Sequence, residues 1–250
     1  MNLAPAKRKR HSRAVQVCLV VLCRRPQPGV GKQRLAADLG RAAAFEIAQR
    51  LWDCAMEDLA DWPGPAALAP AAVGQVRWAR AAAAALAERR AALGAAAQPS
   101  VLAQIGGTLG ARLQRLDATL RASGYERLLF IGTDAPGLDR EQLVTCARQL
   151  ARTDVVLAPA RDGGVVAMGA RRPWPPLAGL PWSTTRLRAS LRAACRAAGL
   201  SVATGPQSFD IDRATDLWYA ARRLARDPRP ARRALVAAIA ALRAQRVARS

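Results

Sequence analysis

The chain combines a basic, glycine-rich stretch with several separated aspartates, the residue types that hold phosphates and metal ions. The stretch CRRPQPGVGKQRLAADLG follows the apolar run VQVCLVVLC and contains Lys32. It is not a Walker loop, G-x-x-x-x-G-K-[ST], because Pro26 stands where the first glycine belongs and Gln33 stands where the hydroxyl belongs. Backbone N–H groups in a glycine turn can still bind phosphate together with a nearby ammonium group. The stretch therefore indicates a phosphate-binding turn of another kind.

Lys32 is unusual in this chain, which uses arginine for nearly all of its 39 basic residues. The only other lysines, Lys7 and Lys9, lie in the basic start of the chain. A compact ammonium group beside a phosphate is a physical reason to keep a lysine at position 32.

Four aspartates stand where other expected strands end. Asp134 follows RLLFIG, Asp162 follows DVVLAPA, and Asp210 and Asp212 belong to the stretch FDID. Carboxylates hold Mg²⁺, which bridges phosphate oxygens, and ligands bind beyond the carboxyl ends of strands in open α/β sheets. Each feature alone also has a structural explanation, since Asp134 or Asp212 could cap a helix and DGG could be a plain hairpin turn. Their joint occurrence at strand ends favours a metal–nucleotide site.

The hydrophobic pattern predicts the elements that position these residues. Apolar runs predict strands, and apolar residues at three- to four-residue spacing predict helices. Alternation of the two along the chain predicts an α/β fold with a mostly parallel sheet covered on both faces. The expected strands lie at 15–23, 66–73, 127–132 and on both sides of the DGG turn, and the expected helices include 34–60, 77–93, 139–151 and 231–246.

Composition restricts the classes of function. The chain has 250 residues, 51% of them hydrophobic, which is enough for one α/β domain with a sizeable core. The net charge of +21 is compatible with nucleic-acid binding, but many basic residues lie at the two ends and few aromatic residues are present for base stacking. A basic nucleic-acid-binding protein is therefore an alternative to an enzyme. It predicts steeply salt-dependent DNA binding.

The cysteines and the single histidine exclude several kinds of site. The five cysteines are scattered without a Cys-x-x-Cys pair, and His11 is the only histidine. A zinc site and a histidine-activated nucleophile are therefore not expected. Reduced thiols suit a cytoplasmic protein, and VQVCLVVLC is too short to cross a bilayer.

Six motifs resemble, in order, those of the bacterial family called DUF2064. They are RRPQPGVGKQRLAADLG, QIGGTLGARL, LLFIGTDAPGL, DVVLAPARDGG, PWSTTRLRASL and FDIDRATDL. The family is similar to GT-A-like nucleotide-diphospho-sugar transferases and distantly similar to molybdenum-cofactor and phospholactate guanylyltransferases. The resemblance covers residues 15–220 and implies a three-layer α/β/α, Rossmann-like GT-A fold. It also implies a metal-dependent transferase that uses a nucleotide-sugar for glycosyl transfer or a nucleoside triphosphate for nucleotidyl transfer.

The resemblance assigns expected roles to individual residues. Mg²⁺ or Mn²⁺ would be held by Asp134 and Asp212, and Asp162 and Lys32 would be the catalytic residues. A small-molecule acceptor would lie against Trp182, Ser183 and Thr184. The expected nucleotide-binding residues are Arg24, Gly29, Gly31, Lys32, Arg34, Gln104, Gly106 and Gly107.

The chain departs from the family pattern near the expected site. Gln33 replaces the threonine of K-T-R-L, Thr108 replaces the aspartate of G-D-L-G, and Val165 and Val166 replace two tyrosines of D-G-G-Y-Y. A non-catalytic nucleotide-binding protein derived from this fold is therefore a second alternative. The expected organisation is a disordered basic tail at 1–14, a transferase domain at 15–225 and a basic C-terminal helix at 226–250.

Overall fold

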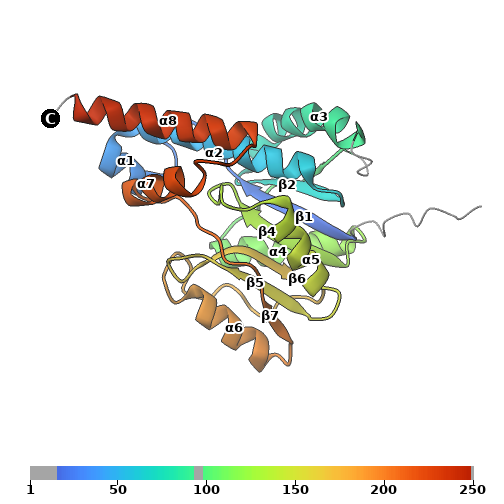
Figure 1. Cartoon of the computed structure of the whole chain (residues 1–250). Helices are drawn as coiled ribbons and strands as arrows, with labels where there is room; N and C mark the ends of the chain where they lie inside the picture. The colour runs from blue at the N-terminus through green and yellow to red at the C-terminus, as the bar shows by residue number, and fades with distance from the viewer. Residues whose placement is uncertain (1–15, 93–97, 249–250) are drawn as a thin grey trace, which may run out of the picture.

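The structure is a computed structural model that describes residues 16–92 and 98–248 (Figure 1). Strands and helices alternate along most of the chain. The strands are β1 (Val17–Cys23), β2 (Ala66–Pro70), β3 (Ser100–Val101), β4 (Arg127–Gly132), β5 (Val155–Pro159), β6 (Val165–Ala170) and β7 (Val202–Thr204). The helices are α1 (Gln33–Leu39), α2 (Arg41–Asp61), the 3₁₀ turn η1 (Val73–Gln75), α3 (Val76–Ala92), α4 (Leu109–Ala122), α5 (Arg140–Gln149), α6 (Leu187–Ala197), α7 (Ala214–Arg223) and α8 (Pro230–Val247).

The strands form one sheet in the order β3-β2-β1-β4-β6-β5-β7. Four of the six pairings in the described sheet are parallel, and only β6 runs antiparallel to its neighbours. β5 and β6 form the hairpin expected around the DGG turn. The prediction of a mostly parallel sheet is confirmed.

Helices cover both faces of the sheet, which makes the three layers. Alternate residues of β1 face opposite sides because strand side chains alternate. Val17, Leu19 and Val21 pack with α2, α3 and α5, whereas Cys18 and Val20 pack with α4 and α6. The fold class expected from the sequence is confirmed.

The chain reverses its direction of sheet growth between β1 and β4. It proceeds from β1 outward to β2 and β3, and then crosses to β4 on the other side of β1. Such a switch point leaves a crevice beyond the carboxyl ends of the two central strands. The turn with Lys32 follows β1 and Asp134 follows β4, so both lie at this crevice.

One expected helix is two helices. The apolar spacing over 34–60 predicts a single helix, but the structure breaks it at Gly40, whose φ is 88°. Glycine adopts this conformation without the steric cost that other residues have. The spacing continues across the break because α1 and α2 both contribute side chains, such as Leu35 and Ile47, to one core cluster.

The C-terminal helix α8 packs on the domain, alongside α2 (Figure 1). Its buried residues Leu235, Ile239 and Leu242 join α1, α2 and α7 in the same core cluster. The periodicity over 231–246 does not distinguish packing on the domain from packing on a partner, and the structure shows the helix packed on the domain. The expected tail at 1–14 lies outside the described residues, and the domain boundaries stay predictions. None of the helices in the described part of the chain has the length and hydropathy needed to cross a bilayer.

Candidate functional site

The side chain of Lys32 joins three segments that are far apart in the sequence. Its ammonium nitrogen donates a hydrogen bond of 2.5 Å to the carbonyl of Ile211. The same nitrogen lies 3.7 Å from Asp134 Oδ2 and 3.6 Å from Asp212 Oδ1. The turn after β1, the loop after β4 and the segment before α7 therefore meet around one cation.

The backbone of Lys32 has a left-handed conformation, with φ 49°. Within the described residues, the only other non-glycine residue with positive φ is Ser183, which lines the same site. Non-glycine residues with positive φ are uncommon, and strained backbone tends to occur at functional sites. Strained backbone therefore occurs at Ser183, which lines the cleft, and at Lys32, which contacts two of the carboxylates that line it.

The loop after β4 places the Asp134 carboxylate over the strand end. Asp134 Oδ1 folds back toward Gly132, where a Cβ atom would lie only 2.4 Å from it. The Asp134 carbonyl accepts a hydrogen bond of 2.9 Å from the Ile211 amide. Glycine at 132 thus makes room for the carboxylate, and the backbone bond fixes it beside Asp212.

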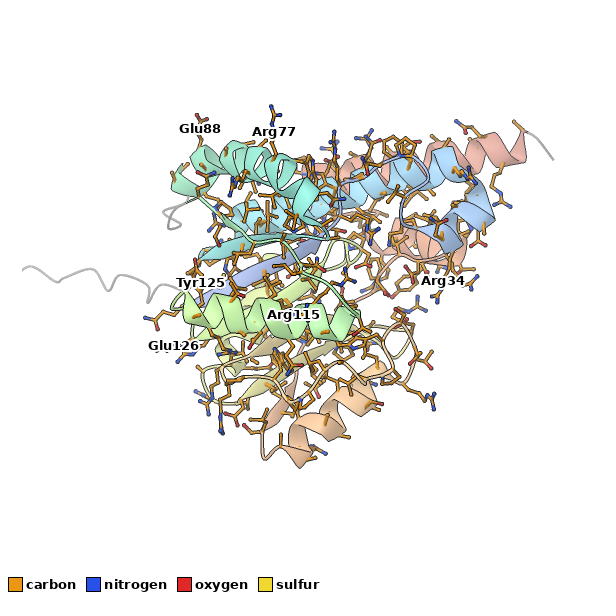
Figure 2. The ribbon with its side chains drawn as sticks, turned by 180° about the vertical axis from the view of Figure 1, so that it is seen from behind. Arg34, Arg77, Glu88, Arg115, Tyr125 and Glu126 are labelled. Carbon is orange, nitrogen blue, oxygen red and sulfur yellow. The ribbon has the colours of Figure 1, made fainter. Side chains whose placement is uncertain are left out.

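A second cation also contacts Asp212. Arg34 Nη1 lies 3.3 Å from Asp212 Oδ2, while Lys32 contacts the other oxygen of the same carboxylate. Arg34 is in the first turn of α1 and is exposed to solvent. Figure 2 shows Arg34 on the opposite side of the molecule from Tyr125 and Glu126, which precede β4.

Asp210 is the most perturbed carboxyl group of the site. Burial is the largest cause that raises the pKa of Asp210, and with the negative charges of Asp134, Asp162 and Asp212 it brings this pKa to about 7. Carboxylates repel one another when they share a site. All four aspartates expected from the strand ends are therefore electrostatically coupled, including Asp210, to which the sequence assigns no role.

The Asp162 turn lies against the segment that carries the expected acceptor-binding residues. Asp162 Oδ1 accepts a hydrogen bond of 2.8 Å from the Gly164 amide. A Cβ atom at Gly163 would lie 2.2 Å from the carbonyl oxygen of Thr185, so only glycine allows this approach. The Arg188 amide donates a hydrogen bond to the Gly163 carbonyl at 3.3 Å. The turn after β5 and the start of α6 are thereby held together.

The four aspartates and residues 182–184 line one cleft of about 230 Å³, whereas Lys32 is not part of the lining and contacts two of its carboxylates. The cleft brings together seven residues expected at the site, namely Arg34, Asp134, Asp162, Trp182, Ser183, Thr184 and Asp212. It also has an apolar wall that sequence analysis did not single out, including Leu109, Phe130 and Met168. The alternation of β4 could have indicated Phe130, but the contribution of antiparallel β6 depends on the tertiary pairing of β6 with β4.

Other expected nucleotide-binding residues lie outside the lining of this cleft. The buried Gln104 donates a hydrogen bond from Nε2 to the Ala69 carbonyl at 2.7 Å, which gives it a structural role at the end of β2. Gly106 and Gly107 form the exposed turn before α4. The exposed residues Arg24 and Gly29, together with Gly31, belong to the turn after β1. Contact of these residues with a nucleotide stays a prediction.

The residues that are present fit a Mg²⁺ or Mn²⁺ ion bound with a substrate. Within the described residues, no three His, Cys, Asp or Glu side chains form a group that could hold a metal ion alone. Mg²⁺ usually uses one or two carboxylates and completes its coordination with water and substrate phosphates. Asp134 and Asp212 already share one cation, the Lys32 ammonium group, and both offer only oxygen. The pair therefore suits a metal that arrives with phosphate ligands.

A protein-family model matches the central part of the chain. The model of the family described as "Uncharacterized protein conserved in bacteria (DUF2064)" matches residues 66–184. The resemblance inferred from the motifs is confirmed. Asp134, Asp162 and the acceptor segment lie within the DUF2064 match, whereas Lys32 and Asp212 lie outside it. A search of curated proteins gives no match.

Solved structures establish the fold. A protein from Desulfovibrio desulfuricans G20, described as a "putative nucleotide-diphospho-sugar transferase", matches with a TM-score of 0.76 and 23% identity, over 92% of this chain and 97% of that chain. A nucleotidyl transferase from Methanothermobacter thermautotroptrophicus has a TM-score of 0.48 and 13% identity, over 81% and 95% of the two chains. A mannosyltransferase from Pyrobaculum calidifontis in complex with GDP-Man and Mn²⁺ has a TM-score of 0.47 and 15% identity, over 94% and 76%. The first match confirms the fold expected for this chain.

Proposed function

We propose that this protein is a metal-dependent transferase that uses a nucleotide-sugar or a nucleoside triphosphate. The observation that carries the proposal is the position of the Lys32 ammonium between Asp134 and Asp212, at the switch point of the sheet. A phosphate-binding turn and a pair of carboxylates converge there, as the chemistry of a metal-bound diphosphate requires. The transferase fold of the Desulfovibrio protein supports the same function.

The basic side chains and the carboxylates would bind different parts of the metal–nucleotide complex. Lys32 and Arg34 would hold the phosphates through charge-assisted hydrogen bonds, with further N–H groups from the glycine turn. Asp134 and Asp212 would hold Mg²⁺ or Mn²⁺. That ion would neutralise a departing diphosphate in glycosyl transfer or polarise an α-phosphate in nucleotidyl transfer.

The acceptor would enter on the side of β5 and α6. Asp162 lies at this side of the cleft, where its carboxylate could accept a proton from an attacking hydroxyl. Ser183 and Thr184 offer hydroxyl groups, and Trp182 is oriented by its hydrogen bond of 2.8 Å to the Leu177 carbonyl. Val165 and Val166 make the adjoining wall apolar, so we infer an acceptor with an apolar surface at that position.

Thermal denaturation with a panel of nucleotides and nucleotide-sugars, with and without Mg²⁺ or Mn²⁺, tests the proposal. We expect at least one ligand to raise the melting temperature only when the metal is present, because bound ligands stabilise the folded state. The shift should disappear in Asp134→Asn and persist in Glu126→Gln, which removes one carboxylate charge from the exposed surface before β4. No metal-dependent shift with any member of the panel would exclude the proposed function.

A non-catalytic nucleotide-binding protein is the second candidate. Lys32 and Arg34 together already offset the charges of both expected metal ligands, so a nucleotide could bind without metal. This candidate predicts nucleotide binding that survives Asp134→Asn, and no turnover of any nucleotide-sugar or triphosphate. Loss of binding in Asp134→Asn, together with metal-dependent turnover by the natural protein, would exclude the non-catalytic candidate.

A further inference from the structure

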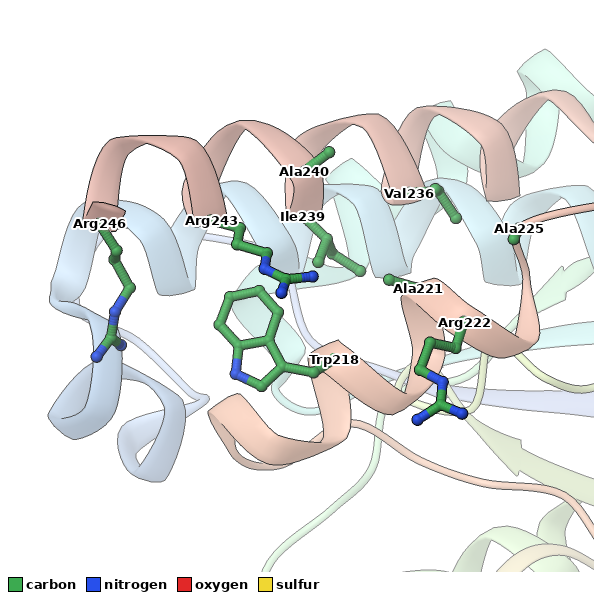
Figure 3. A pocket seen from close by; sticks show the side chains of 9 residues that line it. All are labelled: Trp218, Ala221, Arg222, Ala225, Val236, Ile239, Ala240, Arg243 and Arg246. Carbon is green, nitrogen blue, oxygen red and sulfur yellow. The ribbon is translucent and has the colours of Figure 1, made fainter. Parts of the chain in front are cut away.

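A second cavity lies between α7 and α8, away from the cleft described above (Figure 3). Its volume is about 820 Å³, within the range of roughly 300–1,000 Å³ that small-molecule sites occupy. It is lined by Trp218, Ala221, Arg222, Ala225, Val236, Ile239, Ala240, Arg243 and Arg246.

The floor of this groove is formed by partly buried apolar side chains of α7 and α8. Leu217 and Ala220 of α7 and Leu235 of α8 are buried in the cluster that they share with α1 and α2. The next positions, Trp218 and Val236, are only partly buried and face the groove. Small alanines on both helices leave the space between them unfilled.

Acidic residues are absent from the described lining of this groove, which includes three arginines. Among the described residues, neither Arg222 nor Arg243 takes part in a salt bridge, whereas Arg246 Nη1 approaches the Asp38 carbonyl at 3.5 Å. An apolar floor with uncompensated guanidinium groups complements a ligand that has an apolar body and an anionic end.

We propose that the α7–α8 groove binds a single-chain anionic amphiphile, with its alkyl chain over Val236 and Ile239 and its anionic head at Arg243. Figure 3 shows the Arg243 guanidinium beside Trp218, and Val236 and Ala225 toward the other end of the groove. Residues 236 to 246 of α8 span about 15 Å, since they are ten steps apart at 1.5 Å per residue, and this length is enough for a medium-length alkyl chain.

Charge makes a second copy of this chain a poor occupant. The net charge is +21, and the groove would present its arginines to another cationic molecule. Like charges brought together at an interface oppose association. A small anionic amphiphile satisfies both the apolar floor and the charge.

Calorimetric titration of the full-length protein with octanoate, decanoate and dodecanoate, below their micelle concentrations, tests the proposal. We expect one site whose affinity rises about tenfold with each added pair of methylenes, because each buried methylene contributes about 0.8 kcal/mol. Alkyltrimethylammonium ions of the same lengths should not bind. Equal binding of both head groups, or no dependence on chain length, would overturn the proposal.

Two pairs of variants locate the site on the same helix. Arg243→Gln should weaken dodecanoate binding about tenfold, since a hydrogen bond to a charged group is lost. Arg233→Gln removes an equal charge from an exposed position outside the groove and should change nothing. Ala240→Glu, which places a carboxylate in the groove, should abolish binding, whereas Ala237→Glu should not. Unchanged binding in both groove variants would place any site elsewhere and refute the assignment.

Two further measurements separate other occupants of the groove. Co-sedimentation with phosphatidylglycerol vesicles tests a membrane surface, and light scattering during size-exclusion chromatography tests a second copy. We expect Ala240→Glu to leave both results unchanged relative to Ala237→Glu. Selective loss of vesicle binding, or of a dimer, in Ala240→Glu would show that the groove serves that occupant instead.

Discussion

At the scale of single residues, the site is organised around competition for two carboxylates. Lys32 occupies the space between Asp134 and Asp212, which are also the proposed ligands of the metal. A metal that enters must displace the ammonium group, which then becomes available to a phosphate. The same lysine would therefore hold the two carboxylates close to each other before the metal binds, and would bind the substrate afterwards.

Replacement of Lys32 by methionine should move metal and nucleotide affinities in opposite directions. The affinity for Mn²⁺ without nucleotide should rise, because the competing cation is gone. The affinity for a nucleoside diphosphate should fall about tenfold or more, because a charge-assisted hydrogen bond contributes about 1.5–3 kcal/mol. Calorimetry of Mn²⁺ alone, and of the nucleoside diphosphate in the presence of Mn²⁺, measures the two effects, with Arg192→Met on the exposed α6 surface as the control. A parallel fall of both affinities would refute the competition.

Asp210 gives the stability of the metal-free protein a pH dependence. Its pKa is raised from 3.8 to about 7 in the folded state, so the unfolded chain loses this proton first as the pH rises. Between these values the folded state binds more protons, and stability falls with increasing pH. Asp210→Asn should therefore be more stable than the natural protein at pH 8 by roughly 1 kcal/mol, a modest value because the site is open to solvent.

The corresponding melting temperatures should differ by about 2–4 °C at pH 8. They should coincide near pH 4, where Asp210 is protonated in the folded state. A difference of the same size at both pH values would show that Asp210 acts through packing and not through its charge.

At the scale of elements, glycines set the geometry of two turns for different reasons. Gly40 and Gly163 both have positive φ, 88° and 92°. A Cβ atom at Gly40 would meet open space, whereas one at Gly163 would lie 2.2 Å from the Thr185 carbonyl. Gly40 only separates two helices. Gly163 allows the Asp162 turn to lie against Thr185, next to the expected acceptor-binding residues 182–184.

The two alanine variants should therefore behave differently. Gly40→Ala should lower the free energy of unfolding by about 1–3 kcal/mol, because φ 88° with ψ 159° is a conformation essentially restricted to glycine. Gly163→Ala should lower it by more, and should also weaken acceptor binding, because the Asp162 turn must move away from Thr185. Chemical denaturation and the Michaelis constant for the acceptor measure the two effects. Equal destabilisation with unchanged kinetics would contradict this explanation.

The elements and the acidic half of the site were predictable, and the pairing between them was not. Apolar runs and DGG predict β4, β5 and β6 because strand and turn preferences are local. The spacing over 34–60 could not reveal the break at Gly40, since both helices use the same core. The contacts of Lys32 with Asp134 and Asp212 join residues more than a hundred positions apart, and only the strand order brings them together.

At the scale of the whole molecule, charge is segregated along the carboxyl edge of the sheet. The stretches that follow β1, β2 and β3 carry arginine and lysine with no acidic residue over 24–37, 71–87 and 102–116. The stretches after β4, β5 and β7 carry the four aspartates. This arrangement matches a polyanionic substrate bound with a metal ion. Its phosphates would lie beside the basic stretches, and the metal ion would lie beside the aspartates.

The C-terminal helix also connects the outer layer to the site. Arg232 is fully buried and contacts Glu57 at 3.0 Å and Asp58 at 2.6 Å on α2. The same guanidinium donates hydrogen bonds to the carbonyls of Pro136 and Leu138, in the loop that carries Asp134. Through Arg232, α8 therefore holds the loop that carries Asp134, a proposed metal ligand, by two hydrogen bonds.

Arg232→Met should lower both stability and metal-dependent ligand binding. Removal of one partner of a buried ion pair leaves uncompensated carboxylates and typically costs about 3–5 kcal/mol, which corresponds to a fall of roughly 10 °C in the melting temperature. Arg233→Met, at the next and exposed position, should change stability by less than about 0.5 kcal/mol. At a temperature where both variants are folded, the nucleotide-induced shift with Mn²⁺ should be smaller in Arg232→Met only, because its Asp134 loop has lost two hydrogen bonds. If the nucleotide-induced shift in melting temperature is equal in the two variants, Arg232 stabilises the fold and has no effect on ligand binding.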